Sequence, residues 1–461
     1  MQTLFGQGGQ LRLAEYLDRI GAILGHDRRR ASFATYALGL LSDAERKSIE
    51  PIAARSCPEV EQVGAVHQQL QHFIVDSRWS DRKVRLECAR YAIKAVSVRE
   101  PVGTWQIDDT GFLKQGMHSV GVQRQYTGSA GKIANCQIGV SLTVATGTEH
   151  IPIDFELYLP KTWTESKERR EEARIPEDVT FKTKIEQACE MIGRAVADDI
   201  PRGVVLADSF YGDEPSFRSA VRAQGLHYAV GIKSDNRVWK LDRRGRRCGE
   251  PLTVAQLAHS LEPKASRRLT WRQGVQAPLA GRFAMQRVVP AYRAPGEDLA
   301  QREAVWLIME QPEGEPEIKY SFASLPLNWS KKRIVRLLKQ RWRTERVYQD
   351  LKGELGLDHY EGRRYSGWHH HVSVALACYA FVVAERSRPF FPAQRVESLP
   401  CAHRRGLSGT STIPSSPSVW PSLARSAIGS RAALPAIAGT SPRVAIPRSL
   451  TRQRADTDSG P

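Results

Sequence analysis

The sequence predicts an α/β protein: a mixed sheet interrupted by a β-rich insertion, preceded by a helical N-terminal domain and followed by a disordered tail. Three observations predict this class. Apolar residues recur at helical spacing over residues 10–98. From Gly103 the pattern changes to three consecutive strands and then to alternating helices and strands. After residue 388 the periodicity is nearly lost.

Residues 1–100 are predicted to be helical. The stretches LAEYLDRIGAIL, SFATYALGLL and DRKVRLECARYAIKAV place apolar residues at i, i+3, i+4 and i+7, without the alternation of a strand. Helices of this kind form either a small DNA-binding domain or a bundle that supports the core. The sequence leaves both interpretations open.

Residues 101–234 are predicted to form the first part of the sheet. TWQID, NCQIGVSLTVAT and HIPIDFELYL are rich in β-branched and aromatic residues and are separated by glycine-containing loops. A helix over roughly 181–199, a strand GVVLAD, a helix over roughly 213–223 and a strand HYAVGIK follow. Three strands and then this alternation indicate a mixed sheet covered by helices.

Residues 235–326 return to strand signals and are predicted to be the β-rich insertion. Its strands are RRLTWRQ, RFAMQRVVPAY, AVWLIME and KYSFASL. Residues 327–388 complete the core, beginning with a long helix that opens near Ser330, a residue type that caps helices.

The tail, residues 389–461, has a different composition. It contains 10 Pro, 12 Ser and 9 Arg but no Lys, and we expect it to be disordered. A GC-rich gene translated out of frame would give such a composition, so one hypothesis is a frameshift that replaced the native C-terminus. The other two reading frames past codon 388 test it, because the hypothesis requires one of them to encode a periodic, Lys-containing continuation.

The charge of the chain favours a polyanionic partner. It carries 67 Lys and Arg against 50 Asp and Glu, a formal net charge of +17, and its 41% hydrophobic content excludes a wholly disordered polycation. The surplus is concentrated in residues 233–290, with 13 basic and 4 acidic side chains, and residues 330–352, with 9 and 2. These two stretches are the predicted phosphate contacts.

Cysteine usage and hydropathy indicate the compartment. The seven cysteines are scattered and never spaced C-x-x-C, so neither a disulfide framework nor a zinc site is implied. The N-terminus lacks the pattern of a signal peptide, and no run of about 18 uninterrupted apolar residues occurs. We therefore expect a cytoplasmic protein without membrane contact.

Three carboxylates stand out by position. Asp108 is predicted at the end of the first core strand, Asp208 at the end of the fourth, and Glu345 on the long helix. The C-terminal ends of strands in α/β sheets are where such sheets place active sites. Hard oxygen ligands suit Mg²⁺ or Mn²⁺, and two such ions could activate a water or a 3′-hydroxyl for phosphoryl transfer.

Asp108 is adjacent to Asp109, and strand alternation favours Asp108 as the ligand. Alternation places Gln106, Asp108 and Thr110 on one polar face and Asp109 on the other. Asp109 remains the alternative, either as a ligand or as an aspartate that supports a turn.

Three charged residues are regularly spaced on the predicted helix. Arg341, Glu345 and Lys352 are separated by 4 and 7 residues, so they point in nearly the same direction. Such a face could hold a metal beside cations that clamp phosphates, or it could be a surface ion pair on a solvated helix.

Three motifs together resemble the DDE-type transposases of bacterial insertion sequences, which have a ribonuclease-H-like core. They are WQIDDTGFLKQGMHSVGVQRQYTGSAGKIANCQ, VVLADSFYG and RWRTERVYQDLKGELGLDHYEGRRYSGWHHHV. The resemblance covers roughly residues 15–388 and includes the β-strand insertion before the last acid. The family signature of Arg, three residues, Glu, six residues and Lys is complete, but Leu338 stands where a tyrosine is common.

The resemblance implies a set of roles. Asp108, Asp208 and Glu345 would be the catalytic ligands of two Mg²⁺ ions, and Arg341 and Lys352 would contact phosphates of the transposon end. The implied reaction is cut-and-paste transposition: hydrolytic nicking at the end of the element, then attack of the freed 3′-hydroxyl on target DNA. The implied partner is double-stranded DNA, bound by a homodimer.

Several other residues are weaker candidates. Lys114, Lys132 and Arg124 lie in Gly-rich loops and either contact DNA or are solvated. Neighbours such as His369, His370 and His371 cannot all face one ion, so packing or a phosphate contact is favoured over a metal site. Trp239 and Trp271 are predicted to pack in a core, with stacking on an extruded base as the alternative.

Two other functions remain open. One is a catalytically inactive, sequence-specific DNA-binding protein derived from a decayed element. The other is a host nuclease that acts on RNA–DNA hybrids and requires no particular end sequence.

Overall fold

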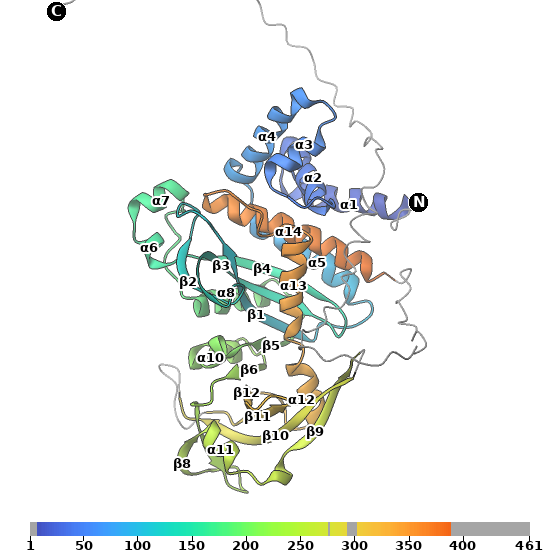
Figure 1. Ribbon diagram of the computed structural model, residues 1–461. Coiled ribbons are helices and arrows are strands. Elements are labelled where there is room, and N and C mark those ends of the chain that lie inside the picture. The colour runs from blue at the N-terminus through green and yellow to red at the C-terminus, as the bar shows by residue number, and fades with distance from the viewer. Residues whose placement is uncertain (1–6, 275–276, 293–301, 389–461) are drawn as a thin grey trace, which may run out of the picture.

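One mixed sheet forms the centre of the molecule, with helices above it in Figure 1 and further strands below. The computed structural model describes residues 7–274, 277–292 and 302–388. Both expectations about residues 389–461, disorder and an origin in a frameshift, lie outside the described residues. Within the described part, no helix is long and apolar enough to cross a membrane.

The N-terminal region is helical, as the periodicity predicts. Its elements are α1 (Gln7–Ile23), α2 (Asp27–Leu41), α3 (Ile49–Ser56), η1 (Val60–Gln62), α4 (Val63–Gln71), η2 (His72–Asp76) and α5 (Asp81–Val96). The Ser80 hydroxyl caps α5 by accepting a hydrogen bond from the Lys83 amide. The buried apolar residues of these helices belong to the same cluster as those of the sheet. The N-terminal helices therefore share their core with the sheet.

The first half of the sheet contains both antiparallel and parallel neighbours. Its strands are β1 (Thr104–Leu113), β2 (Gln123–Thr127), β3 (Lys132–Ala145), β4 (His150–Tyr158), β5 (Val204–Ala207) and β6 (Tyr228–Ile232). β3 pairs antiparallel with β1, β2 and β4, whereas β5 lies parallel to both β1 and β6. This mixed α/β arrangement confirms the predicted fold class and is consistent with a ribonuclease-H-like core.

Helices cover the sheet between these strands. They are α6 (Lys161–Thr164), α7 (Lys167–Ala173), α8 (Lys184–Ala197), α9 (Ser209–Gly212) and α10 (Pro215–Ala223). A capping box between Thr183 and Glu186 begins α8 inside the predicted range of 181–199. Between the strand HIPIDFELYL and α8, where the sequence predicts neither a helix nor a strand, the structure contains α7.

The insertion is β-rich, as predicted, and it continues the core sheet. Its elements are β7 (Arg237–Leu241), β8 (Arg247–Thr253), α11 (Val254–His259), η3 (Pro263–Ala265), β9 (Arg267–Gln273), β10 (Pro278–Pro290), β11 (Val305–Pro312) and β12 (Lys319–Ala323). β12 pairs antiparallel with β6, with Tyr320 opposite Ile232. The described residues thus form one twelve-stranded sheet that spans core and insertion. Whether the predicted boundaries mark independent domains stays a prediction.

The prediction of one long helix after the insertion was wrong. Ser330 does cap a helix, accepting from the Arg333 amide, but two helices follow: α12 (Lys331–Leu338) and α13 (Trp342–Gly353). The break has a tertiary cause, because α12 packs against β9 of the insertion whereas α13 packs against β1 and β4 of the core. One straight helix could not contact both.

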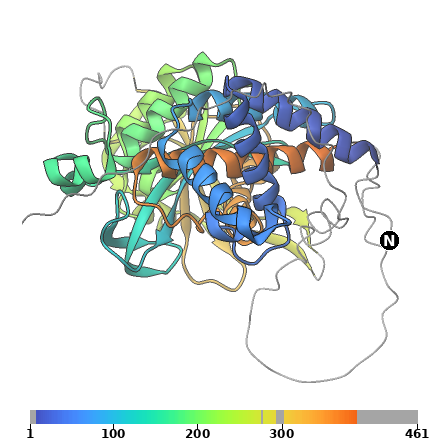
Figure 2. The same ribbon diagram turned by 90° about the horizontal axis from the view of Figure 1, so that it is seen from above.

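The last described helix, α14 (Tyr365–Arg386), is buried over almost its whole length. Figure 1 shows it between the N-terminal helices and the sheet, and the view from above shows the blue N-terminal helices lying across it (Figure 2). It contacts α5, α2 and β4. A helix that is apolar on all sides is expected at such a central position.

Candidate active site

Two of the three predicted carboxylates lie at equivalent positions on neighbouring parallel strands. In the pairing of β1 with β5, Gln106 is opposite Leu206, and Asp108 and Asp208 each follow two residues later. Asp208 directly follows β5 and caps α9, where its Oδ1 accepts from the Phe210 amide at 3.0 Å. The prediction that Asp108 ends its strand was wrong, because β1 continues to Leu113 through antiparallel pairing with β3.

The surroundings of Asp108 disfavour its charged form. Burial raises the pKa of Asp108 to about 7; Arg341 opposes this shift, and the carboxylates of Asp208 and Asp109 add to it. A buried carboxylate beside another carboxylate is destabilised in its charged form unless a cation joins it. The site therefore has the donor chemistry of a cation-binding site.

Arg341 bridges Asp108 and Glu345. Its Nη1 lies 3.4 Å from Asp108 Oδ2, and its Nη2 lies 3.6 Å from Glu345 Oε1. The Glu345 side chain is 63% exposed. No group of three His, Cys, Asp or Glu side chains among the described residues is gathered closely enough to hold a metal ion. The structure thus brings Asp108 and Asp208 near each other and connects Glu345 to Asp108 only through the guanidinium.

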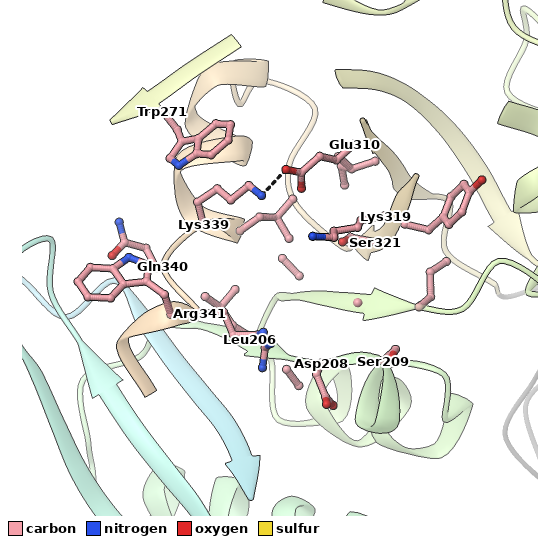
Figure 3. Close-up of a pocket in the computed structure, with 18 of the residues that line it drawn as sticks. Leu206, Asp208, Ser209, Trp271, Glu310, Lys319, Ser321, Lys339, Gln340 and Arg341 are labelled. Atoms are coloured by element: carbon pink, nitrogen blue, oxygen red, sulfur yellow. Dashed lines mark hydrogen bonds and ion pairs between the residues drawn. The ribbon is translucent and has the colours of Figure 1, made fainter. Parts of the chain in front are cut away.

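A cleft of about 1430 Å³ lies between the core and the insertion, and Asp208 is one of its lining residues whereas Asp108 is not. Figure 3 shows Asp208 and Ser209 on the core side, and Trp271, Lys339 and Glu310 on the opposite side. Arg341 and Glu345 also line the cleft. The site is therefore open to solvent and bounded by both parts of the sheet.

Asp109 lies on the other face of β1, as the alternation predicts. Its Oδ2 is 2.9 Å from Nζ of Lys184 on α8. The opposite face carries the contacts to Arg341, so the two adjacent aspartates face different partners. This geometry favours Asp108 over Asp109 as the neighbour of the cleft, because Asp108 contacts the cleft residue Arg341.

Lys352 does not point into solvent beside Arg341. Its Nζ donates to Thr110 Oγ1 at 2.8 Å and to the Gly111 carbonyl at 2.6 Å. Helical spacing correctly places it on the side of α13 that faces β1, but it gives no information about which group the amine reaches. The phosphate contact implied for Lys352 stays a prediction.

The three cations predicted near the first acid do not line the cleft. Lys114 donates to the Tyr360 carbonyl at 2.6 Å, whereas Arg124 and Lys132 are exposed on β2 and β3. Their contact with DNA stays a prediction.

The consecutive histidines are packing residues on α14. His369 Nε2 lies 3.4 Å from Glu156, His370 stacks on Trp79 with 3.9 Å between ring centroids, and His371 Nδ1 pairs with the Tyr36 hydroxyl at 2.9 Å. All three are buried and face different neighbours. Packing is confirmed, and the burial leaves no exposed ring for a phosphate.

The predicted core packing of the two insertion tryptophans is only partly correct, since both are half-buried. Trp239 lies under the guanidinium of Arg247, 5.4 Å from the ring centroid. Trp271 packs edge-on against Phe283 and beneath Lys339 Nζ, 4.6 Å from its ring centroid, at the wall of the cleft. Stacking on a base stays a prediction for each.

The fold brings the two basic stretches of the sequence together at the edge of the cleft. α12 packs against β9, and Arg272 of β9 and Arg336 of α12 both line the cleft. Lys332, one turn before Arg336, is exposed like them. We call Arg272, Lys332 and Arg336 the basic rim. No carboxylate of the described residues pairs with any of them.

Carboxylates at matching positions of two neighbouring parallel strands, beside a cleft with a basic rim, suit an enzyme that cuts a phosphodiester chain. Residues 19–278 match the family model of the DDE superfamily endonucleases, which is more than half of the chain. The protein belongs to this family. The matched region includes Asp108 and Asp208 and ends before Glu345.

A curated relative carries a more specific name. The probable transposase for insertion sequence element IS701 of Microchaete diplosiphon is 28% identical over 232 residues. The aligned part is 50% of this chain and 56% of the relative, so the chain spans about half of the length of that protein.

Enzymes of the DDE superfamily use divalent metal ions. The residues present fit such an ion, because Asp108 and Asp208 offer hard oxygen donors and a cation would offset the burial that disfavours the charged form of Asp108. Glu345 could join them once Arg341 releases it. The spacing of four residues indicated the pair of Arg341 with Glu345, but nothing in the sequence indicated the contact of Arg341 with Asp108.

Proposed function

We propose that the protein is a transposase that cuts DNA at the ends of an insertion sequence and joins the freed ends to target DNA. The observation that carries the proposal is the carboxylate pair of Asp108 and Asp208: Arg341 contacts Asp108, and Asp208, Arg341 and Glu345 line the cleft. Membership of the DDE superfamily and the name of the curated relative support it. The presence of all three acids argues against an inactive remnant.

The proposed cofactor is a pair of Mg²⁺ ions, with Mn²⁺ as a substitute, held by Asp108, Asp208 and Glu345. Such ions lower the pKa of an attacking water or 3′-hydroxyl and stabilise the leaving oxygen. Arg341 must leave Asp108 and Glu345 when the acids take up this role. Its guanidinium, still one turn from Glu345, is then free to bind a phosphate through charge-assisted hydrogen bonds.

The proposed partner is double-stranded DNA, both as element end and as target, and the proposed assembly on DNA is a homodimer in the cytoplasm. The basic rim would hold the phosphate backbone at the mouth of the cleft without reading the sequence. The proposal therefore separates phosphate binding, at the rim, from chemistry, at the acids.

The test begins with the DNA on either side of the gene. We expect terminal inverted repeats bordered by a short target duplication, and we expect a duplex that carries one repeat to be nicked at its end in Mg²⁺. A duplex with a scrambled repeat is the control and should remain intact. Equal cutting of both duplexes, or preferential cutting of an RNA–DNA hybrid, would contradict the proposal and favour a general nuclease.

Neutralising the basic rim should weaken DNA binding in a salt-dependent way. For Lys332→Gln/Arg336→Gln we expect the slope of log K against log salt to decrease by about 2, since each lost phosphate contact removes about 0.9. Fluorescence anisotropy at four salt concentrations measures the slope. Arg268→Gln is the matched control, because Arg268 is an exposed arginine of the insertion that already pairs with Glu313 at 2.5 Å. An equal decrease in the control would mean that only net charge matters.

A further inference from the structure

The contact between α13 and the sheet contains a row of buried hydrogen bonds. Gln106 of β1 is fully buried and makes two hydrogen bonds at the start of α13: its Nε2 donates to the carbonyl of Gln340, just before the helix, at 3.2 Å, and its Oε1 accepts from Thr344 Oγ1 on the helix at 2.6 Å. One turn further, the Tyr348 and Ser141 hydroxyls lie 2.7 Å apart. Thr344 and Ser141 are fully buried as well.

Lys352 completes the row one turn after Tyr348, through its bonds to Thr110 Oγ1 and the Gly111 carbonyl. The helix positions involved are therefore four residues apart, and they form a single stripe that faces β1 and β3. We call this stripe with its strand partners the polar seam. Its members are Gln106, Thr110, Gly111 and Ser141 on the strands and Gln340, Thr344, Tyr348 and Lys352 on the helix side.

The polar seam surrounds Asp108. Gln106 and Thr110 stand on either side of Asp108 on the same face of β1, and Ser141 is the residue of β3 that pairs with Asp108 across the ladder. On the helix, Glu345 directly follows Thr344. The contacts that dock α13 are thus the neighbours of the acid on the strand and of the acid on the helix.

Hydrogen bonds are directional, and a buried polar group without a partner is costly. A shift of α13 by one residue would rotate it by about 100° and leave each buried member of the seam without its partner. An apolar interface would tolerate small slides and rotations much better. The seam therefore has the properties of a device that fixes one register.

We propose that the polar seam fixes the position of α13 along its axis and its rotation about that axis, so that Glu345 and Arg341 stand opposite Asp108. Thr344, Tyr348 and Lys352 are positioning residues in this proposal, and the amine of Lys352 holds Thr110 and Gly111 of β1. The proposal rests on the proposed function in one respect, because it assigns Glu345 to the same cation site as Asp108.

The test removes one hydroxyl at a time. Thr344→Val and Tyr348→Phe keep size and burial, whereas Thr344→Ser keeps the hydroxyl. For Thr344→Val we expect Mn²⁺ binding, measured by calorimetry on the DNA-free protein, to weaken about tenfold, a typical cost of losing a partner that orients metal ligands. The kcat for cleavage should fall by a similar factor with KM for DNA unchanged, and Thr344→Ser should restore both.

Hydrogen exchange of the α13 amides provides a readout that is independent of activity. Exchange should accelerate in Thr344→Val and Tyr348→Phe, whether or not the parent protein cuts DNA. This separates the two proposals: a parent that neither binds Mn²⁺ nor cuts element ends overturns the proposed function, while unchanged exchange and unchanged Mn²⁺ affinity in both variants overturn the seam.

Val347→Ala is the matched control on the same helix. Val347 is fully buried and makes none of the hydrogen bonds of the seam. We expect it to lower the melting temperature while Mn²⁺ affinity stays at the parent value. If Val347→Ala weakened Mn²⁺ binding as much as Thr344→Val does, general loosening of α13 would explain both results, and the positioning role would be overturned.

Discussion

Replacing Asp108 by Asn is expected to reduce DNA cleavage by at least about 10³-fold, because a cation that stabilises transition-state charge contributes several kcal/mol. Asn keeps the shape of the side chain but loses the anionic oxygen. The same change should leave the melting temperature equal or higher, since burial and the neighbouring acids already raise the pKa of Asp108 to about 7 and so disfavour its charged form. Single-turnover cleavage rates and thermal unfolding measure the two effects.

The adjacent aspartate provides the control. Asp109→Asn removes a charge one residue away, but Asp109 pairs with Lys184 on the opposite face of β1. We expect this variant to cut DNA at close to the parent rate and to lose a little stability. The assignment of the two aspartates would be reversed if Asp109→Asn were inactive while Asp108→Asn still cut.

The face of β1 could be predicted from sequence because it depends only on local geometry. A strand alternates with a period of two, so the polar set of Gln106, Asp108 and Thr110 follows from any correct assignment of the strand. The contacts of Gln106 and Thr110 with α13 show that this face is the one that meets the helix. The end of β1 was not predictable in the same way, because its second half is held by pairing with β3.

The elements that were missed depend on long-range contacts. The break between α12 and α13 contains no Gly or Pro, so nothing in the local sequence marks it. It arises because the two helices dock on different parts of the sheet. Likewise, the pairing of β12 with β6, which joins insertion to core, links residues far apart in the sequence, and strand signals do not name their partners.

The burial of Arg85 likewise depends on long-range contacts and could not be predicted from the sequence. Asp81 and Arg85 are four residues apart on α5, a spacing that usually means a weak surface pair. In the structure the Arg85 side chain is only 3% exposed, because β4 and α14 cover it. Burial changes the energetics of this pair completely, and the sequence contains no sign of it.

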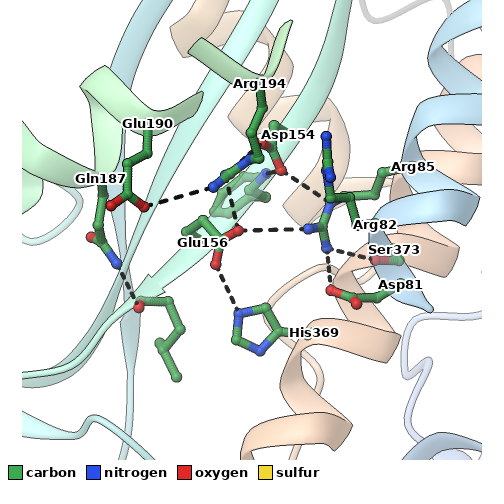
Figure 4. A network of polar contacts seen from close by, with 12 residues as sticks. Asp81, Arg82, Arg85, Asp154, Glu156, Gln187, Glu190, Arg194, His369 and Ser373 are labelled. Carbon is green, nitrogen blue, oxygen red and sulfur yellow. Dashed lines mark hydrogen bonds and ion pairs between the residues drawn. The ribbon is translucent and has the colours of Figure 1, made fainter. Parts of the chain in front are cut away.

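Figure 4 shows the resulting network, in which Arg85 lies among three carboxylates. Its distances to Asp81, Asp154 and Glu156 are 2.6, 3.1 and 3.7 Å. Burial alone would raise the pKa of Asp81, but Arg85 holds it well below its ordinary value. Arg85 thus favours the charged form of Asp81, and Arg194 is the second arginine of the network.

Arg85→Met is therefore expected to lower the free energy of unfolding by about 3–5 kcal/mol, the usual cost of leaving buried charges without their partner. Urea denaturation at pH 7 measures it. Arg82→Met is the matched control: Arg82 lies on the same helix and pairs with Asp198, but its side chain is 51% exposed, and such surface pairs contribute about 0–1 kcal/mol. A loss below about 1 kcal/mol in Arg85→Met would contradict this expectation and show that the pairs of Arg194 with Asp154 and Glu156 are enough to maintain the network. A large loss in Arg85→Met alone would show that this network ties α5 and α14 to the sheet that carries Asp108 and Asp208.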